Sequence, residues 1–183
     1  ALQRVSGQGN VEEQLGCYVS LARIAVYRGD WADAERWLDL AEPLLFRYDL
    51  EGIAPILHAW RARVRAELDD IDGVLAAIGR ADALDVRRWS LHLVRSDLSI
   101  GRALARAGLL AEAMARVDQA LQRADAAGYR FYTFKARKLL ADIVKDPAGA
   151  DRHARVARAL ARSLAANLSP ADATSFLAHH GFE

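Results

Sequence analysis

Stretches in which apolar residues recur every three or four positions alternate with short polar turns along the chain. In the first stretch, Leu15, Tyr18, Leu21, Ile24 and Ala25 follow helical spacing, which is typical of a helix with one buried face. β-Branched residues are sparse and form no run that predicts a strand. The pattern therefore predicts an all-α protein, with helices at about 11–28, 31–46, 51–68, 71–83, 86–107, 110–127, 129–145, 150–167 and 170–179.

Several helix ends carry their own signals. Asp30 is expected to cap the helix that begins at about residue 31, and Ser169 followed by proline is a typical start of a helix. Pro43 is expected to kink or end the second helix in its last turn. Asp146-Pro147 is expected to break the helix at 129–145, because proline disfavours helix at the residue before it. The next helix is expected at about 150–167.

The turns repeat at a fixed interval. Gly29-Asp30, Asp69-Asp70 and Gly108-Leu109 are separated by 40 and 39 residues. A period in this range is typical of stacked helical hairpins rather than of one globular core. We expect an all-α, right-handed α-α superhelix of about four hairpins, closed by a C-terminal capping helix. Residues 1–10 are polar and are expected to be a linker or a frayed N-terminus, with the repeat domain covering 11–183.

The residues around these turns resemble the tetratricopeptide repeat (TPR). In that family, a large and a small residue on the first helix, a glycine at the turn and alanines on the second helix recur. The second unit matches less well, since Arg61, Arg65 and Val74 depart from the pattern although Ala62 and Ala81 fit it. The best matches are Leu21-Ala22, Gly29-Asp30-Trp31, Ala34, Leu38 and Ala41 in the first unit, and Ile100-Gly101, Leu104, Gly108, Ala113, Val117 and Ala120 in the third.

The period of about 40 residues exceeds that of the usual repeat. It resembles the long-period variant found in large multidomain bacterial signalling and regulatory proteins. The resemblance covers about residues 11–178 and implies a module that binds rather than catalyses. The small residues have a physical reason, because alanine and glycine allow paired helices to approach closely.

Composition adds little about partners. The chain has 183 residues, a formal net charge of +1 and 52% apolar residues. Residues 1–100 carry a net charge of −4 and residues 101–183 a net charge of +5, which predicts a molecule that is electrostatically polar from end to end. The single cysteine, Cys17, excludes an intramolecular disulfide and is expected to be a buried apolar residue. With no apolar run of membrane-spanning length, a cytoplasmic setting fits best.

No pattern for catalysis, cofactors or metals stands out. A glycine-rich phosphate loop, an HExxH helix and a nucleophile elbow are all missing from the sequence. His179 and His180 are adjacent, so they do not share a helix face, and no third ligand is evident. The acidic run at residues 67–72 is interpreted as solvated capping residues. We expect no enzyme, cofactor or metal site.

The favoured function is a scaffold or adaptor that binds a peptide or partner protein in a concave groove lined by the first helix of each hairpin. The alternative is a sensory domain that binds a small effector or a neighbouring domain of a larger regulatory protein. Nothing in the sequence identifies the oligomeric state. The groove contacts are expected on helix faces turned away from the core, at Tyr18, His58, Arg61, Arg65, Asp97 and Lys138.

A basic stripe is predicted on the helix at 150–167. Its four arginines fall within about 120° of one another on a helix. The segment 129–138, just before it, interleaves aromatic and basic residues. Three interpretations stay open: a solubilising outer face, a docking site for an acidic protein and, least favoured, a nucleic-acid contact. The stripe consists of Arg152, Arg155, Arg158 and Arg162.

Overall fold

The computed structural model describes residues 11–48, 52–84 and 90–182. Within these ranges the chain is all-α, with nine helices and no strand. The predicted linker at 1–10 lies outside the described residues. The helices are α2 (Val11–Arg28), α3 (Trp31–Tyr48), α4 (Ala54–Glu67), α5 (Ile71–Asp82), α6 (Ser90–Arg106), α7 (Leu110–Ala126), α8 (Arg130–Ile143), α9 (Pro147–Ala165) and α10 (Pro170–His179).

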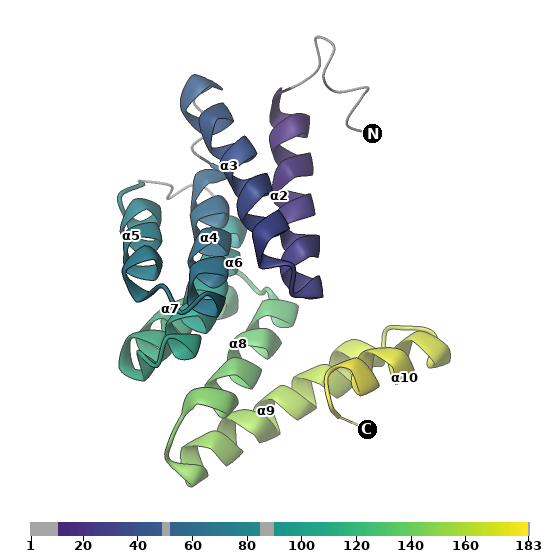
Figure 1. Ribbon diagram of the computed structural model, residues 1–183. Coiled ribbons are helices and arrows are strands. Elements are labelled where there is room, and N and C mark those ends of the chain that lie inside the picture. The colour runs from purple at the N-terminus through teal and green to yellow at the C-terminus, as the bar shows by residue number, and fades with distance from the viewer. Residues whose placement is uncertain (1–10, 49–51, 85–89, 183) are drawn as a thin grey trace.

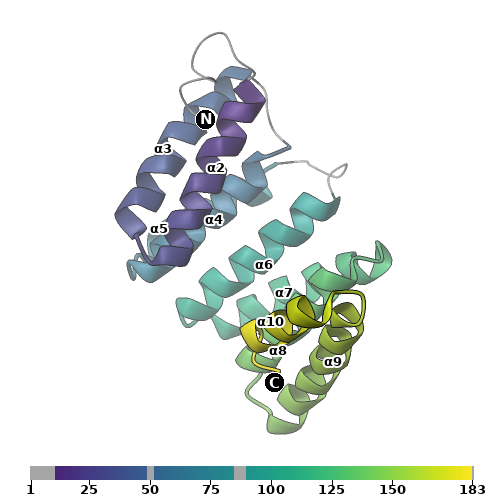
Figure 2. The same ribbon diagram turned by 90° about the vertical axis from the view of Figure 1, so that its right-hand side faces the viewer.

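Consecutive helices pack in pairs. The main contacts within pairs join α2 to α3, α4 to α5, α6 to α7 and α8 to α9. Further contacts join α2 to α4, α4 to α6 and α6 to α8, so the first helices of the four pairs are neighbours in space. Figures 1 and 2 show the pairs following one another from α2–α3 at the top to α8–α9 at the bottom. This packing is consistent with a helical repeat.

The buried small residues recur with the period of the turns. Ala22, Ala62 and Gly101 are separated by 40 and 39 residues, and all three are buried. Two large clusters of buried residues result, one from α2 to α4 and the other from α4 to α8. Helix α4 is buried on almost all sides, because it contacts α2, α3, α5 and α6. Trp60 of α4 belongs to the cluster from α2 to α4.

Helices α6 and α7 approach each other closely at Gly101. A Cβ atom at this position would lie 2.4 Å from Cγ2 of Val117, a fully buried and β-branched side chain with little freedom to move. We expect Gly101→Ala to lower the free energy of unfolding by about 1–3 kcal/mol, measured by urea unfolding. Gly16→Ala is the control, since α2 leaves open space there, and it is expected to stabilise the fold by about 0.5–1 kcal/mol. A loss that Val117→Ala does not reduce in the double variant would contradict the proposed clash.

The three predicted turns all use the left-handed backbone region. Gly29 and Gly108 have φ values of 75° and 81°, which glycine adopts without strain. Asp69, at the equivalent position of the second turn, has a φ of 55°. A residue with a Cβ atom is strained in this conformation. The turn thus keeps its geometry although the glycine of the pattern is missing.

We expect Asp69→Gly to raise the free energy of unfolding by about 0.5 kcal/mol, because the backbone strain is removed. The Asp69 side chain is 81% exposed, and its ion pair with Arg106 at 3.3 Å is a surface pair that contributes little. Thermal unfolding measures the change. Asp72→Gly, in the first turn of α5, is the control and is expected to destabilise the helix. Equal destabilisation by both variants would exclude strain at residue 69.

The predicted helix caps and the predicted break at Asp146-Pro147 agree with the structure, whereas the end of α3 and the start of α9 differ from the expected positions. Asp30 and Ser169 accept hydrogen bonds from the backbone N–H groups three residues later, at 3.2 and 3.3 Å. Pro43 does not end α3, which continues to Tyr48; the proline is exposed, so water can reach the carbonyl group that it leaves unpaired. Pro147 is the first residue of α9, because Asp146 caps this helix through a hydrogen bond of 2.8 Å from Gly149.

The C-terminal segment, which we define as residues 170–182, packs against α8 and α9. Phe176 and Leu177 of α10, together with Phe182, pack against a third cluster centred on Phe134. The last helix thus covers the end of the helix array, in agreement with the expected C-terminal capping helix. The ring of His180 lies between Phe134 and Phe176, with centroid distances of 4.9 and 4.8 Å. Lys138 donates a hydrogen bond of 2.7 Å to the backbone oxygen of His180.

Packing of the C-terminal segment is expected to depend on pH. Burial, together with the positive charges of His179, Lys138, Lys135 and Arg102, lowers the pKa of His180 from 6.5 to about 4. A detached segment therefore binds a proton more tightly than the packed one, so packing is strongest above pH 6.5 and weakens as the pH falls towards 4. Hydrogen exchange of residues 170–182 measures the loss. The variant His180→Asn removes the titrating group, and the same loss of protection in that variant would contradict the assignment.

Candidate partner-binding site

Three of the six residues predicted to contact a partner are buried. His58, Arg61 and Asp97 are 4%, 7% and 2% exposed, so the expectation that they lie on faces turned away from the core is wrong. Burial, opposed by Glu42 and reinforced by Arg80 and Arg61, lowers the pKa of His58. Each of the two charged residues has partners from neighbouring helices. A role in partner binding stays a prediction for the six residues. A group of basic side chains without ion-pair partners among the described residues lies at another face of α4, described below.

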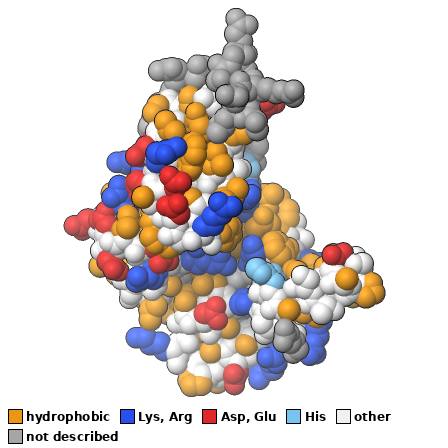
Figure 3. All heavy atoms as spheres, turned by 45° about the vertical axis from the view of Figure 1, so that its right-hand side comes forward, with side chains coloured by type: hydrophobic (Ala, Val, Ile, Leu, Met, Phe, Trp, Pro, Cys, Tyr) orange, Lys and Arg blue, Asp and Glu red, His pale blue; other side chains and the backbone are white. Residues whose placement is uncertain are grey.

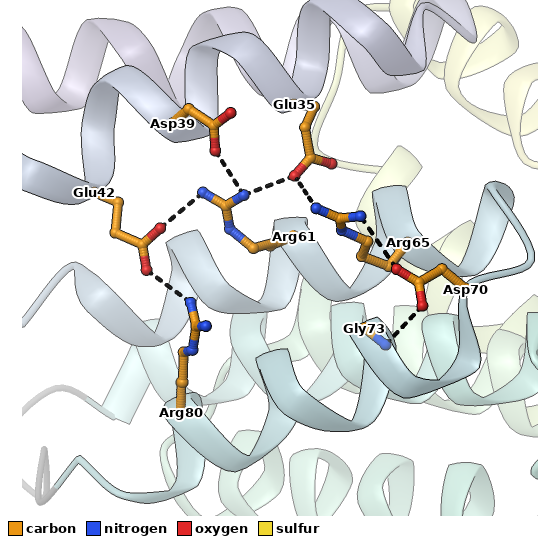
Figure 4. Close-up of polar contacts among 8 residues, drawn as sticks. All are labelled: Glu35, Asp39, Glu42, Arg61, Arg65, Asp70, Gly73 and Arg80. Atoms are coloured by element: carbon orange, nitrogen blue, oxygen red, sulfur yellow. Dashed lines mark hydrogen bonds and ion pairs between the residues drawn. The ribbon is translucent and has the colours of Figure 1, made fainter.

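Arg61 lies at the centre of an ion network that joins α3, α4 and α5 (Figure 4). Its guanidinium donates hydrogen bonds of 2.7 Å to Glu35, 2.8 Å to Asp39 and 3.0 Å to Glu42. Arg65, one turn later, contacts Glu35 at 2.8 Å and so shares a carboxylate with Arg61. We call this set the Arg61 network; it comprises Arg61, Arg65, Arg80, Glu35, Asp39, Glu42 and Asp70.

Asp97 forms a second, smaller set of ion pairs between α6 and α7. It accepts hydrogen bonds from Arg123 and, at 3.1 Å, from Arg116. Arg116 also reaches Asp82 of α5 at 2.8 Å. Burial raises the pKa of Asp97, and the two arginines oppose this shift. Asp97 therefore connects helices within the fold.

Tyr18 of α2 and Lys138 of α8, the two remaining predicted residues, have different surroundings. Tyr18 stacks on Trp37 of α3 with a centroid distance of 5.9 Å, and Lys138 lies at the C-terminal segment. Cys17 is half-buried rather than fully buried. The Cζ atom of Arg158 lies 6.0 Å from the centre of the Phe182 ring. All four arginines of the predicted stripe are exposed along α9: Arg152, Arg155, Arg158 and Arg162.

A basic pocket lies on the opposite side of α4, where the first helices of all four pairs meet. Its volume is about 240 Å³. Figure 3 shows Lys and Arg side chains gathered in a hollow across the middle of this face, with hydrophobic side chains beside them. We define the basic pocket by its lining: Arg23 and Tyr27 of α2, Trp60 of α4, Arg95, Leu98, Ser99 and Arg102 of α6, and Phe131, Tyr132 and Lys135 of α8.

The lining contains four cations and no carboxylate. Arg63, whose Cζ atom lies 4.9 Å from the centre of the Trp60 ring, adds a fifth cation beside it. Among the described residues, none of the five forms an ion pair within 4 Å. Burial lowers the pKa of Lys135, and Arg102, Arg95, Arg23 and Arg63 lower it further. The pocket therefore holds an excess of positive charge that the described part of the chain does not neutralise.

The arginines of the other face are paired. Arg61, Arg65, Arg80 and Arg116 each contact at least one carboxylate. On the pocket side, Arg106, one turn after Arg102 on α6, pairs with Glu67 and Asp69, whereas the five cations at the pocket form no ion pair within 4 Å among the described residues. The distribution of charge between the two faces, rather than between the two halves of the chain, distinguishes the basic pocket.

Aromatic rings form much of the wall. Tyr27 and Trp60 meet edge to face with a centroid distance of 6.0 Å, and Phe131 and Tyr132 do so at 5.5 Å. Lys135 lies over the Phe131 ring at 4.6 Å. Tyr27 is 65% exposed and Phe131 is 37% exposed, so both present ring surface to solvent. Exposed aromatic residues beside arginines are typical anchors of a binding site.

A larger cleft of about 900 Å³ lies between α5, α6 and α7. Leu75 and Ile78 of α5 form part of an apolar wall, while Gln119 and Gln122 of α7 are polar. Asp97 and its two arginines contribute to the same lining. Both arginines of this cleft are paired with carboxylates of the same lining, Asp82 and Asp97, unlike the cations of the basic pocket.

The spacing of three arginines in the sequence indicates the basic pocket, although none of the three is among the six residues predicted to contact a partner. Arg23, Arg63 and Arg102 are separated by 40 and 39 residues, the same spacings as the turns. Each follows directly after one of the buried small residues Ala22, Ala62 and Gly101. Equivalent positions of a repeat lie next to one another in neighbouring pairs, so these arginines form a row.

Comparisons of the chain with protein-family models, with curated proteins and with solved structures give no match. Of the described helices, none is long and apolar enough to cross a membrane. The geometry of the two faces is therefore the basis for the function proposed below.

Proposed function

We propose that the chain is a TPR-like right-handed superhelix that binds an acidic segment of a partner protein on the face formed by α2, α4, α6 and α8. The observation that carries the proposal is the basic pocket. Its four cations, and Arg63 beside it, form no ion pair with a carboxylate among the described residues. The role is that of an adaptor within a larger regulatory protein and requires no catalytic step.

Charge complementarity supports an acidic partner. The cations of the pocket are half-buried and repel one another, and this repulsion adds to the effect of burial in lowering the pKa of Lys135. A segment that brings carboxylates or other anions relieves this repulsion and gains charge-assisted hydrogen bonds. Tyr27 and Phe131 supply exposed ring surface for the apolar part of the contact.

A random peptide library displayed on phage tests the proposal. We expect the selected peptides to be enriched in Asp and Glu, and their affinity to fall as salt is raised, since screening weakens the attraction. The variant Arg95→Glu/Arg102→Glu reverses two charges of the pocket and is expected to lower the affinity at least about tenfold.

The matched control is Arg155→Glu/Arg162→Glu, which makes the same change on exposed positions of α9. It is expected to bind like the unmodified protein. Equal loss in both variants would indicate a nonspecific effect of net charge, and selection of neutral peptides would contradict an acidic partner. Loss in the control alone would favour the predicted arginine stripe on α9 as the binding surface.

A sensory role is the second candidate, and the cleft between α5, α6 and α7 favours it. Its volume of about 900 Å³ lies in the range of small-molecule sites, ~300–1,000 Å³. A screen of small polar compounds by thermal shift tests it. We expect a ligand of the cleft to lose its effect in the variant Gln119→Trp, which fills the cleft, and to keep it in the pocket variant Arg95→Glu/Arg102→Glu.

A further inference from the structure

We propose that the basic pocket is a subsite for a phosphorylated tyrosine side chain carried by the partner segment. This inference rests on the proposed function, because it specifies the group that the acidic segment places between α2, α4, α6 and α8. Three observations support a phosphotyrosine side chain as the occupant: the size of the pocket, its charge and its aromatic wall.

The size fits one side chain. At about 240 Å³ the pocket is smaller than the sites that bury a drug-sized ligand, which span ~300–1,000 Å³. A dinucleotide or a comparable cofactor is too large for it. The exposed rings of Tyr27 and Phe131 show that the pocket is open to solvent, so a side chain of a docked segment can enter.

The charge favours a group with more than one negative charge. Arg23, Arg95, Arg102 and Lys135 come from three helices and line one small cavity, with Arg63 beside them. A carboxylate brings a single negative charge and two oxygens. A phosphoryl monoester brings a charge of about −1.5 to −2 and three acceptor oxygens, and arginine guanidinium groups match its geometry with two parallel hydrogen bonds.

The aromatic wall favours a ring next to that phosphoryl group. Trp60 contributes a buried indole ring, and Tyr27 meets it edge to face. Phe131 and Tyr132 form a second edge-to-face pair in the same lining. A phenyl ring inserted between them gains aromatic contacts that a phosphoserine side chain, with a single methylene group, does not provide.

The test uses one neutral glycine–serine peptide in four forms, with tyrosine, phosphotyrosine, phosphoserine or glutamate at its central position. Fluorescence anisotropy measures the affinity of each form for the whole chain. We expect the phosphotyrosine form to bind about tenfold or more tightly than each of the others. Phenyl phosphate is expected to compete with it, and inorganic phosphate to compete more weakly.

Variants locate the subsite. Arg102→Gln/Lys135→Gln is expected to weaken phosphotyrosine binding at least about tenfold and to leave the tyrosine form unchanged. The control, Arg155→Gln/Arg162→Gln on α9, is expected to keep full binding. Thermal unfolding checks the fold of the pocket variant, which we expect to be no less stable than the unmodified chain, because two mutually repelling charges are removed.

The outcomes separate this inference from the proposed function. Equal binding of the glutamate and phosphotyrosine forms would overturn the phosphoryl subsite, and equal binding of the phosphoserine form would overturn the role of the aromatic wall. If acidic library peptides bind on this face while the phosphotyrosine form binds no better than tyrosine, the inference fails and the proposed function stands. If neither kind of peptide binds, both fail.

Discussion

The variant Arg61→Gln is expected to lower the free energy of unfolding by about 3 kcal/mol, because it removes the cation on which three carboxylates converge. Arg61 is almost fully buried, and its contacts with Glu35, Asp39 and Glu42 measure between 2.7 and 3.0 Å. Without it, these negative side chains face one another at the junction of α3 and α4. This loss is at the lower end of the range for breaking a buried ion pair, about 3–5 kcal/mol, because Asp39 is largely exposed and water can solvate it.

Urea unfolding followed by circular dichroism measures this loss. Arg36→Gln is the control, since Arg36 forms a single exposed pair with Asp33 at 3.6 Å and is expected to contribute less than about 0.5 kcal/mol. A similarly small effect of Arg61→Gln would show that the Arg61 network does not stabilise the junction. A partial recovery in the double variant Arg61→Gln/Glu42→Gln is expected, because one of the uncompensated charges is then removed as well.

Local patterns gave most of the helices correctly. Helical spacing, turns and helix caps depend on residues close together in the chain. The turns at Gly29 and Gly108 and the cap at Ser169 could therefore be predicted from the sequence. The turn does not strictly require glycine, because Asp69 adopts the left-handed conformation that glycine adopts in the other two turns. Two helix ends differ from the expectation: α3 does not end at Pro43 but continues to Tyr48, and α9 begins at Pro147 rather than near residue 150. Helix ends depend on solvent access and on a cap as well as on proline itself.

The binding face was harder to predict, because it depends on which side of α4 its neighbours cover. Arg61 and Arg63 are two positions apart and point about 200° away from each other on a helix. Only the packing of α3 against α4 shows that Arg61 faces acidic partners within the chain. The spacing of Arg23, Arg63 and Arg102 was the available signal, and it becomes visible only when the repeat period is applied to polar as well as to apolar positions.

The variant Phe134→Ala is expected to lower the free energy of unfolding of the C-terminal part of the chain by about 3–5 kcal/mol. Phe134 is fully buried, and its ring centre lies 6.0 Å from those of both Phe176 and Phe182. Removing the ring leaves a cavity between α8 and the C-terminal segment and takes away the surface on which α10 packs. Because α10 otherwise contacts α9 alone, we expect hydrogen-exchange protection of residues 170–182 to fall almost completely.

The effect of Phe134→Ala is expected to stay local. Stability in stacked helix pairs is close to a sum over neighbouring pairs, so α2 to α5 should keep their protection while α8 to α10 lose theirs. Val156→Ala, an exposed apolar position on α9, is the control and is expected to change protection little. Uniform loss of protection across α2 to α10 would instead show that the four pairs unfold as a single cooperative unit, and would argue against the nearest-neighbour behaviour expected of a helical repeat.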